Sequence, residues 1–315
     1  ANDPEDSDDS DASGASDDPD DPDGAGEAVR SRVGVLRGCV QEGLFAHVNG
    51  ATRRVLEANG LAVVDAPEQG CCGAIHAHGG DLEGARELAR RNVDAFEAAG
   101  LDRVVVNAAG GGAIMKEYGH LLAGDPEYAE RAARLGAGVC DVSEALAEGG
   151  GPLPGAPVEF AVAYDAPCHL LHAQGVADPP RRVLEAAGVE LRELEDAGEC
   201  CGGAGIYGIA HPELGGRIGA DKVTAVERSG ARAVATGNPG CIMQIGAGLR
   251  ARRSDVRPLH PVEILDESYR RAGLYRADGD GRGPLRRPSD IRGRASSRDA
   301  HDEIQSEIER AEEGR

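Results

Sequence analysis

The chain has 315 residues, enough for two ordinary domains or one large domain, and carries a formal net charge of −21. This acidity argues against direct binding to nucleic acid or an anionic membrane surface, and an aromatic content of 3% leaves few side chains for bases to stack on. The sequence lacks both a signal peptide and an apolar run of about 18 residues. We therefore expect no transmembrane segment and a cytoplasmic protein.

The two ends of the chain differ in composition from the middle. Residues 1–27 hold twelve Asp and Glu, no Lys or Arg and almost nothing apolar, so we predict a disordered acidic linker over 1–30. A polar tail is expected over 276–315. Lys116 and Lys222 are the only lysines among 34 basic residues, a bias typical of a halophile's cytoplasm or of a GC-rich genome.

Strand and helix patterns alternate through the first half of the middle region. Strands are expected at 32–36, 61–64 and 103–107, with helices at 51–59 and 81–99. The second half repeats this order, with strands at 160–164, 189–194 and 231–236 and helices at 180–187 and 212–229.

The shorter helix of each half ends at a glycine, Gly60 or Gly188, as helices with a glycine C-terminal cap do. The alternation predicts an α/β fold of mostly parallel sheets flanked by helices. Loops at the carboxyl ends of such strands tend to carry the chemistry, and the repeated cysteines fall at those places.

The two halves also repeat in sequence. Arg-Arg-Val-Leu-Glu-Ala occurs at 53–58 and again at 181–186. In each half a single cysteine precedes a Cys-Cys-Gly triplet with the same spacing: Cys39 with Cys71-Cys72, and Cys168 with Cys200-Cys201. We infer a duplication, with a first cysteine-rich domain at 31–150 and a second at 151–275.

The second half has the fuller cysteine set, formed by Cys168, Cys200, Cys201 and Cys241. Clustered cysteines in a chain without an export signal bind metal or do redox chemistry more often than they form disulfides. Thiolates select iron–sulfur clusters, zinc or copper(I). Glycines around the cysteines, among them Gly202 and Gly240, would let the backbone approach a bulky inorganic group. The residues therefore predict an iron–sulfur cluster here. We expect a 4Fe–4S cluster, although the residues themselves do not specify the cluster type.

Other interpretations of the set remain open. Free cysteine is often a small buried apolar residue. Zinc also suits four thiolates, although its structural sites usually use Cys-x-x-Cys knuckles, which this chain lacks. A disulfide within the Cys200-Cys201 pair is disfavoured because adjacent α-carbons lie about 3.8 Å apart, closer than the about 4.4 Å that a disulfide needs.

The first half has an incomplete set of Cys39, Cys71 and Cys72, and Gly111 stands where the fourth cysteine would be. Cys140, His76 and His78 are candidates for a fourth ligand, although Cys140 lies outside the repeat and is expected in the core. A cluster in this half is therefore doubtful. In the second half, His169 and His172 flank Cys168 and are candidates either for hydrogen bonds to cluster sulfur or for loop packing.

The doubled cysteine pattern resembles the cysteine-rich (CCG) domain of heterodisulfide reductases and their relatives. The finer similarity is to the iron–sulfur subunit of glycolate oxidase. The segments that carry it are 66–74, 116–122, 167–175, 200–205 and 260–265. This resemblance implies a subunit of an oxidoreductase complex that carries electrons from a flavin-binding 2-hydroxy-acid (glycolate or lactate) oxidase subunit toward a quinone. It also implies association with the membrane only through partners.

The chain departs from that family in two places. Relatives usually have cysteine where this chain has Gly111, and usually carry ferredoxin-like cysteine runs at the amino end, which this chain lacks. Residues 1–30 are then either a linker to an upstream ferredoxin-like domain or the start of a shorter form like the lactate-utilisation proteins. Alternative functions are a heterodisulfide-reductase-like catalytic subunit that acts on a disulfide and a non-catalytic scaffold for the flavin subunit. The sequence indicates no catalytic residue.

Overall fold

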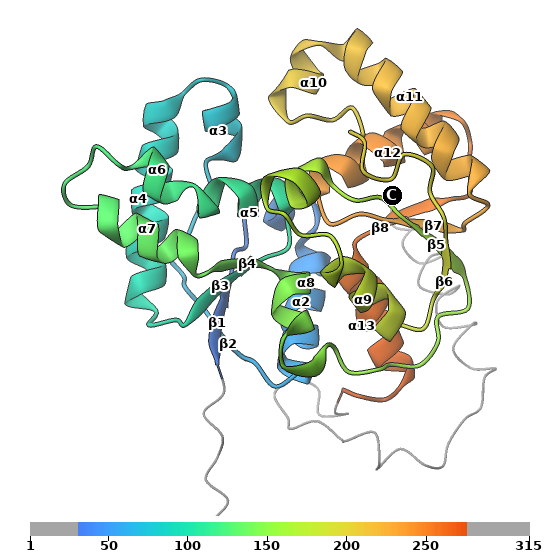
Figure 1. The fold of residues 1–315 in the computed structure, drawn as a ribbon, viewed down its shortest axis with the longest axis horizontal. Coiled ribbons are helices and arrows are strands. Elements are labelled where there is room, and N and C mark those ends of the chain that lie inside the picture. The colour runs from blue at the N-terminus through green and yellow to red at the C-terminus, as the bar shows by residue number, and fades with distance from the viewer. Residues whose placement is uncertain (1–30, 276–315) are drawn as a thin grey trace, which may run out of the picture. The chain divides into compact units, whose positions relative to one another are not determined.

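The computed structural model describes residues 31–275, which form two four-stranded sheets flanked by helices (Figure 1). The expected linker 1–30 and tail 276–315 lie outside the described residues. Within 31–275, no helix is both long enough and apolar enough to cross a membrane.

The first sheet contains four parallel strands in the order β2-β1-β3-β4. Its strands are β1 (Arg32–Val35), β2 (Ala62–Val64), β3 (Arg103–Val106) and β4 (Val139–Asp141). The helices of this half are α1 (Cys39–Leu44), α2 (Ala46–Ala58), α3 (Ala74–His78), α4 (Leu82–Ala98), α5 (Ala109–Lys116), α6 (Tyr118–Leu121), α7 (Ala129–Ala137), α8 (Val142–Ala147) and the 3₁₀ turn η1 (Glu148–Gly150).

The second sheet repeats this topology, with parallel strands in the order β6-β5-β7-β8. Its strands are β5 (Ala161–Tyr164), β6 (Glu190–Arg192), β7 (Ala233–Ala235) and β8 (Arg257–Leu259). Its helices are the π-helical turn η2 (His169–Ala173), α9 (Pro179–Ala186), α10 (Ile206–Ala210), α11 (Pro212–Arg228), α12 (Pro239–Ala251) and α13 (Pro261–Arg271). The predicted fold class, a duplicated α/β domain with parallel sheets, is confirmed.

Alternation along the strands separates the two faces of each sheet. In β3, Val105 packs with α2 and α8, whereas Val104 and Val106 pack with α4, α5, α6 and α7 on the opposite face. Likewise in the second sheet, Ala233 faces the core that includes α9 and α13, and Val234 faces α11 and α12. Figure 1 shows α2, α8, α9 and α13 gathered between the two sheets.

The two halves share one apolar core. Buried residues of α2 and β1 belong to the same cluster as buried residues of α9, β5 and α13. Across this contact, Arg54 of α2 donates two hydrogen bonds, of 2.9 and 2.8 Å, to the carboxylate of Asp266 in α13. The last helix of the second half is therefore anchored on the first long helix of the first half.

The structure changes several predicted boundaries. The helix expected at 51–59 begins earlier, at Ala46, and the strand expected at 189–194 is only Glu190–Arg192. β4 and β8 were not predicted, because each contains a residue that is uncommon in strands, Asp141 in β4 and Pro258 in β8. The predicted C-terminal caps are present, with Gly60 and Gly188 at φ 86° and 65°. The domain border at 150/151 stays a prediction.

Candidate metal centre

Three segments of the second half bring four cysteines together at the carboxyl ends of its strands. Cys168 follows β5 as the N-cap residue of η2, and Cys200 and Cys201 lie in the loop after β6. Cys241 was expected in a loop, but it lies in the first turn of α12, which follows β7. The thiols of Cys201 and Cys241 hydrogen-bond at 3.2 Å. Further thiol hydrogen bonds join Cys168 to Cys200 and Cys200 to Cys201, so the set is continuous.

Backbone groups support this set of sulfurs. The amide N–H of Gly202 donates to Cys200 Sγ at 3.3 Å. Gly202 has φ 84°, and a Cβ there would lie 2.3 Å from the carbonyl oxygen of Gly215 in α11, so only glycine fits. This close approach lets the loop after the cysteine pair lie against α11 and turn an amide toward sulfur.

Hydrogen bonds within the set concentrate negative charge on one sulfur. Hydrogen bonds from Cys168 and Cys201 lower the pKa of Cys200 to about 2, whereas the bond to Cys200 raises the pKa of Cys168 and of Cys201. These hydrogen bonds favour the thiolate form of Cys200, and the thiolate is the form in which cysteine binds metals.

The histidines near Cys168 take different roles. His169 Nδ1 lies 3.6 Å from Cys168 Sγ, and its ring stacks on His78 of the first half with 5.4 Å between ring centroids. His172 Nε2 instead contacts the carbonyl oxygen of Gly198 at 3.2 Å. Of the two candidates, only His169 is placed to contact sulfur, while His172 holds the loop that leads to Cys200.

The incomplete set of the first half is also brought together. The thiols of Cys39 and Cys71 lie 3.1 Å apart, and a hydrogen bond from Cys71 lowers the pKa of Cys72. Asn92 Nδ2 donates to the carbonyl oxygen of Cys71 at 2.9 Å, and the Tyr118 hydroxyl donates to that of Cys72 at 2.8 Å. These two buried side chains fix the backbone of the cysteine pair.

Gly111 occupies the fourth position of this first set. A Cβ built on Gly111 would lie 3.6 Å from Cys72 Sγ, just as Cys241 lies beside Cys201 in the other half. The other groups nearest that point are apolar carbons of Leu36 and Val106. Cys140 is buried in β4 within the shared core, and burial raises its pKa to about 12. Cys140 thus packs as a core residue, as expected.

The closest sulfurs are 3.1 Å apart in the first set, between Cys39 and Cys71, and 3.2 Å apart in the second set, between Cys201 and Cys241. Among residues 31–275, no group of three or more His, Cys, Asp or Glu side chains is spaced as the ligands of one metal ion.

Sequence reasoning missed two features beside the second set. Asn238 Nδ2 donates to Cys241 Sγ at 3.4 Å. Lys222 and Asp165 form an ion pair of 3.0 Å whose side chains are only 2% and 1% exposed, and the positive charge of Lys222 contributes to lowering the pKa of Cys200. The signals available were the position of Asn238 three residues before Cys241 and the rarity of lysine in this chain.

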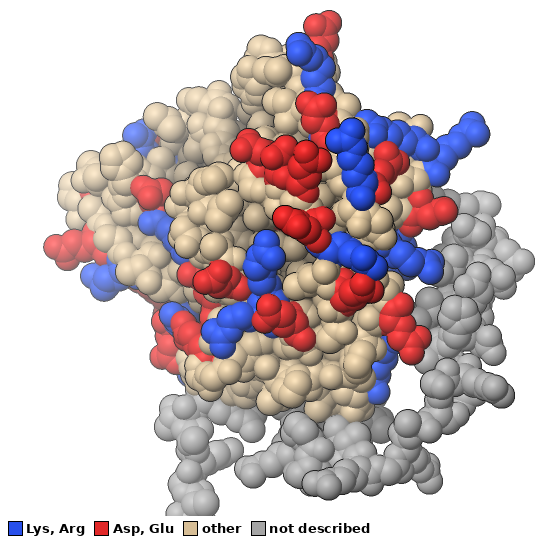
Figure 2. All heavy atoms as spheres, turned by 45° about the vertical axis from the view of Figure 1, so that its right-hand side comes forward, with Lys and Arg blue, Asp and Glu red and all other residues tan. Residues whose placement is uncertain are grey.

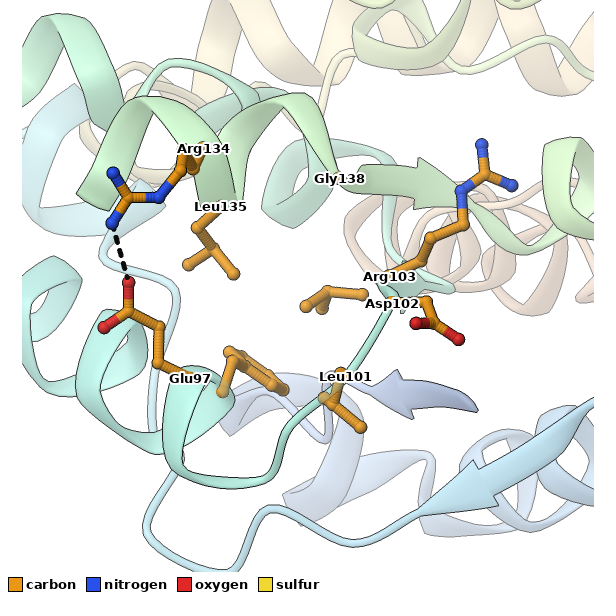
Figure 3. Close-up of a pocket in the computed structure, with 9 residues that line it drawn as sticks. Glu97, Leu101, Asp102, Arg103, Arg134, Leu135 and Gly138 are labelled. Carbon is orange, nitrogen blue, oxygen red and sulfur yellow. Dashed lines mark ion pairs between the residues drawn. The ribbon is translucent and has the colours of Figure 1, made fainter. Parts of the chain in front are cut away.

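One pocket formed by the described residues lies away from the cysteines. A pocket of about 160 Å³ lies at the amino end of β3, lined in part by Leu101, Arg103 and Leu135, and an ion pair of 3.6 Å between Arg134 and Glu97 closes one side (Figure 3). It lies at the sheet edge opposite to the one where chemistry collects in parallel sheets. Figure 2 shows basic and acidic side chains interspersed on one face of the molecule.

Comparisons with known proteins agree with the duplicated cysteine frame. A family model described as "Cysteine-rich domain" (CCG) matches residues 33–116 and 162–246. The chain is 38% identical over 249 residues to the "Probable glycolate oxidase iron-sulfur subunit" of Bacillus subtilis, covering 76% of this chain and 55% of that protein. The chain thus spans little more than half the length of this relative.

A second relative matches over nearly its whole length. "Lactate utilization protein A" of Oceanobacillus iheyensis is 29% identical, with 75% of this chain and 96% of that protein covered. The crystal structure of a hypothetical protein from Helicobacter pylori shares the fold, with a TM-score of 0.53 at 10% identity, covering 76% of this chain and 49% of that one. Since the family model matches both halves and more than half of the residues, the chain belongs to the cysteine-rich (CCG) domain family.

Proposed function

We propose that this chain is an iron–sulfur subunit that carries electrons in the oxidation of a 2-hydroxy acid, with glycolate and lactate as candidate substrates. The observation that carries the proposal is the convergence of Cys168, Cys200, Cys201 and Cys241 from three segments at one edge of the second sheet. Bound by these residues, an iron–sulfur cluster of the 4Fe–4S type would supply one-electron redox chemistry.

The donor set fits an iron–sulfur cluster. All four side chains are soft thiols, the ligands that such clusters take. A backbone N–H already points at Cys200 Sγ, and hydrogen bonds to sulfur are a means by which proteins stabilise and tune such groups. His169, beside Cys168, is a further neighbour of this kind.

The cysteine set of the first half is an incomplete site. Cys39, Cys71 and Cys72 provide three thiols, and at the fourth position Gly111 provides none. The described side chains that a Cβ at Gly111 would meet, apart from Cys72, are aliphatic and cannot bind a metal. The two halves are therefore unequal, and the second half is the one that would hold a cluster by protein ligands alone.

The substrate class and the partners rest on the relatives. One is named as the iron–sulfur subunit of a glycolate oxidase, and another for lactate utilisation. A flavin-binding subunit would remove electrons from the hydroxy acid, and this chain would pass them on toward a quinone. Co-purification of the native protein with identification of its partners tests this part, and a partner without flavin would contradict it.

The cluster itself is tested by metal analysis of matched cysteine variants. We expect anaerobically purified protein to contain iron and acid-labile sulfide and to give an EPR signal on reduction. Cys241→Ala removes one of the four thiols and should abolish most of the second-half iron. Cys140→Ala, a buried cysteine outside both sets, is the control and should keep it.

Two results would contradict the assignment. One is a colourless wild-type protein with stoichiometric zinc even after anaerobic reconstitution. The other is equal iron content in Cys241→Ala and Cys140→Ala, because ligand loss should distinguish these two substitutions.

A further inference from the structure

The side chain of Asn238 lies between the two cysteine sets. Its Nδ2 donates to Cys241 Sγ at 3.4 Å, and its Oδ1 accepts a hydrogen bond of 3.2 Å from the backbone N–H of Gly110. Gly110 belongs to the first turn of α5, and the next residue, Gly111, faces Cys72 of the first set. A single amide thus connects a thiol of the second half with the helix that borders the thiols of the first.

The contact with Gly110 fixes which way the amide points. A backbone N–H can only donate, so it requires the oxygen of Asn238 on its side. The NH₂ group must then face Cys241 Sγ, where it acts as a donor. The orientation follows from the hydrogen-bond partners and does not depend on telling nitrogen from oxygen in the side chain.

The surrounding residues leave room for this amide. A Cβ on Gly240 would lie 3.2 Å from Asn238 Nδ2, a contact tight enough to displace it, and a Cβ on Gly110 would lie 3.7 Å from Oδ1. Asn238 also begins α12 but makes no side-chain cap to its own helix. Its hydrogen bonds go instead to a cysteine sulfur and to the other half, so helix capping does not account for it.

The first half lacks the donor and the thiol together. Aligning Gly111 with Cys241 places Ala108 opposite Asn238, three residues earlier in each half. The half without the fourth cysteine is therefore also the half without the amide that would donate to it. If the role of Asn238 is to donate to the cysteine sulfur, the half that lacks this sulfur has no need of the amide. A residue required only for the fold would have no reason to be absent together with the cysteine.

We propose that Asn238 is a positioning residue that holds the Cys241 sulfur and raises the reduction potential of the second-half cluster. This inference rests on the proposed function. Adding an electron increases the negative charge on the ligand sulfurs, and a hydrogen bond strengthens as its acceptor becomes more negative. The amide therefore stabilises the reduced form more than the oxidised form, as hydrogen bonds to sulfur do in such sites.

The test compares Asn238→Ala with Gln244→Ala in the anaerobically prepared full chain, by redox titration followed by EPR. Gln244 lies on the same helix and donates to a backbone carbonyl, that of Gly215, at 3.2 Å. The potential responds only to the difference in strength of this hydrogen bond between the two oxidation states, so its loss should lower the reduced-to-oxidised ratio by up to about tenfold, a fall in potential of up to about 59 mV for one electron. Gln244→Ala should leave the potential at the wild-type value.

Asn238→Asp covers the case in which the alanine variant does not fold. It keeps the acceptor for Gly110 but puts an oxygen in place of the donor, so the potential should again fall. Loss of iron from either Asn238 variant, in protein that melts like wild type, would also support the role in holding Cys241. An unchanged potential and iron content in the Asn238 variant that folds would overturn the inference. A wild-type chain without iron and sulfide would instead refute the proposed function.

Discussion

Gly111 and Cys241 hold equivalent places in the two halves and differ by one side chain. Cys241 touches Cys201, and a Cβ on Gly111 would reach Cys72 at 3.6 Å. The contacts with Leu36 and Val106, at 3.5 and 3.6 Å, are ordinary van der Waals distances, so a side chain fits there. At the residue scale, the asymmetry between the halves therefore depends on a missing thiol and not on a blocked position.

Gly111→Cys should convert the three-thiol set into a four-thiol set. We expect iron and sulfide per chain to rise above wild type after anaerobic reconstitution, because the first half then offers the same donors as the second. Ala113→Cys is the control, since two residues further along α5 the side chain points about 200° around the helix. An equal gain of iron in both variants would show that any added thiol suffices, against this interpretation.

Two helices begin at buried titratable caps whose effects on stability oppose each other. Asp141 accepts a hydrogen bond of 2.9 Å from the Ser143 N–H at the start of α8, and His260 accepts one of 3.1 Å from the Val262 N–H at the start of α13. Burial raises the pKa of Asp141 to about 6 and lowers the pKa of His260 to about 4. At the element scale, these caps link helix formation to pH.

Asp141→Asn should change how stability depends on pH. Between about pH 4, the ordinary Asp pKa, and pH 6, the native wild type binds more protons than the unfolded chain, so Asp141 makes stability fall as pH rises. Asparagine can still cap α8 but does not titrate. As the pH rises from 4 to 7, the free energy of unfolding of the variant should therefore increase by up to about 3 kcal/mol relative to that of wild type, at about 1.4 kcal/mol per pKa unit.

His260→Asn is the matched variant with the opposite sign. His260 is uncharged when buried but takes up a proton below about pH 6.5 when unfolded, so wild-type stability falls as pH drops from there toward 4. Asparagine does not titrate, so the variant should lose less stability than wild type as the pH falls toward 4. Urea unfolding of both variants across pH 4–7 measures the two slopes, and slopes of the same sign would contradict this account.

The two halves pack on one another through the helices between the sheets. The core cluster that contains Val33 and Val55 of the first half also contains Val162 and Leu265 of the second. Asp266, whose side chain is 4% exposed, pairs with Arg54 across this contact and with Arg270 of its own helix at 2.7 Å. At the scale of the whole molecule, unfolding either half would expose the core of the other.

Arg54→Met should lower the stability of both halves together. The loss should be about 2 kcal/mol, the size of hydrogen bonds to a charged group, because Arg270 still partly compensates Asp266. Thermal unfolding should remain a single transition at a lower Tm, by calorimetry and by circular dichroism. Arg53→Met, on the same helix but bonded within the first half to Glu57 and Asp65, is the control with a smaller effect. Two separate transitions would contradict the shared core.

The duplication, the strand–helix alternation and the two unequal cysteine sets could all be predicted from the amino-acid sequence. Each is a property of residue order: Cys39 and Cys168 precede their pairs with the same spacing, and apolar periodicity marks the long helices at 82–98 and 212–228. The α/β class followed because alternating elements of this kind form parallel sheets, whose carboxyl ends bring the cysteine segments together.

The contacts between the two halves could not be predicted from the sequence and became visible in the folded structure. Asn238 reaches Gly110, and Arg54 reaches Asp266, across sequence separations of 128 and 212 residues. No local periodicity encodes such contacts, because they depend on how two finished sheets pack through the helices between them. β4 and β8 were also found only in the structure, because each contains a residue that is uncommon in strands, Asp141 or Pro258, and pairs at the edge of its sheet.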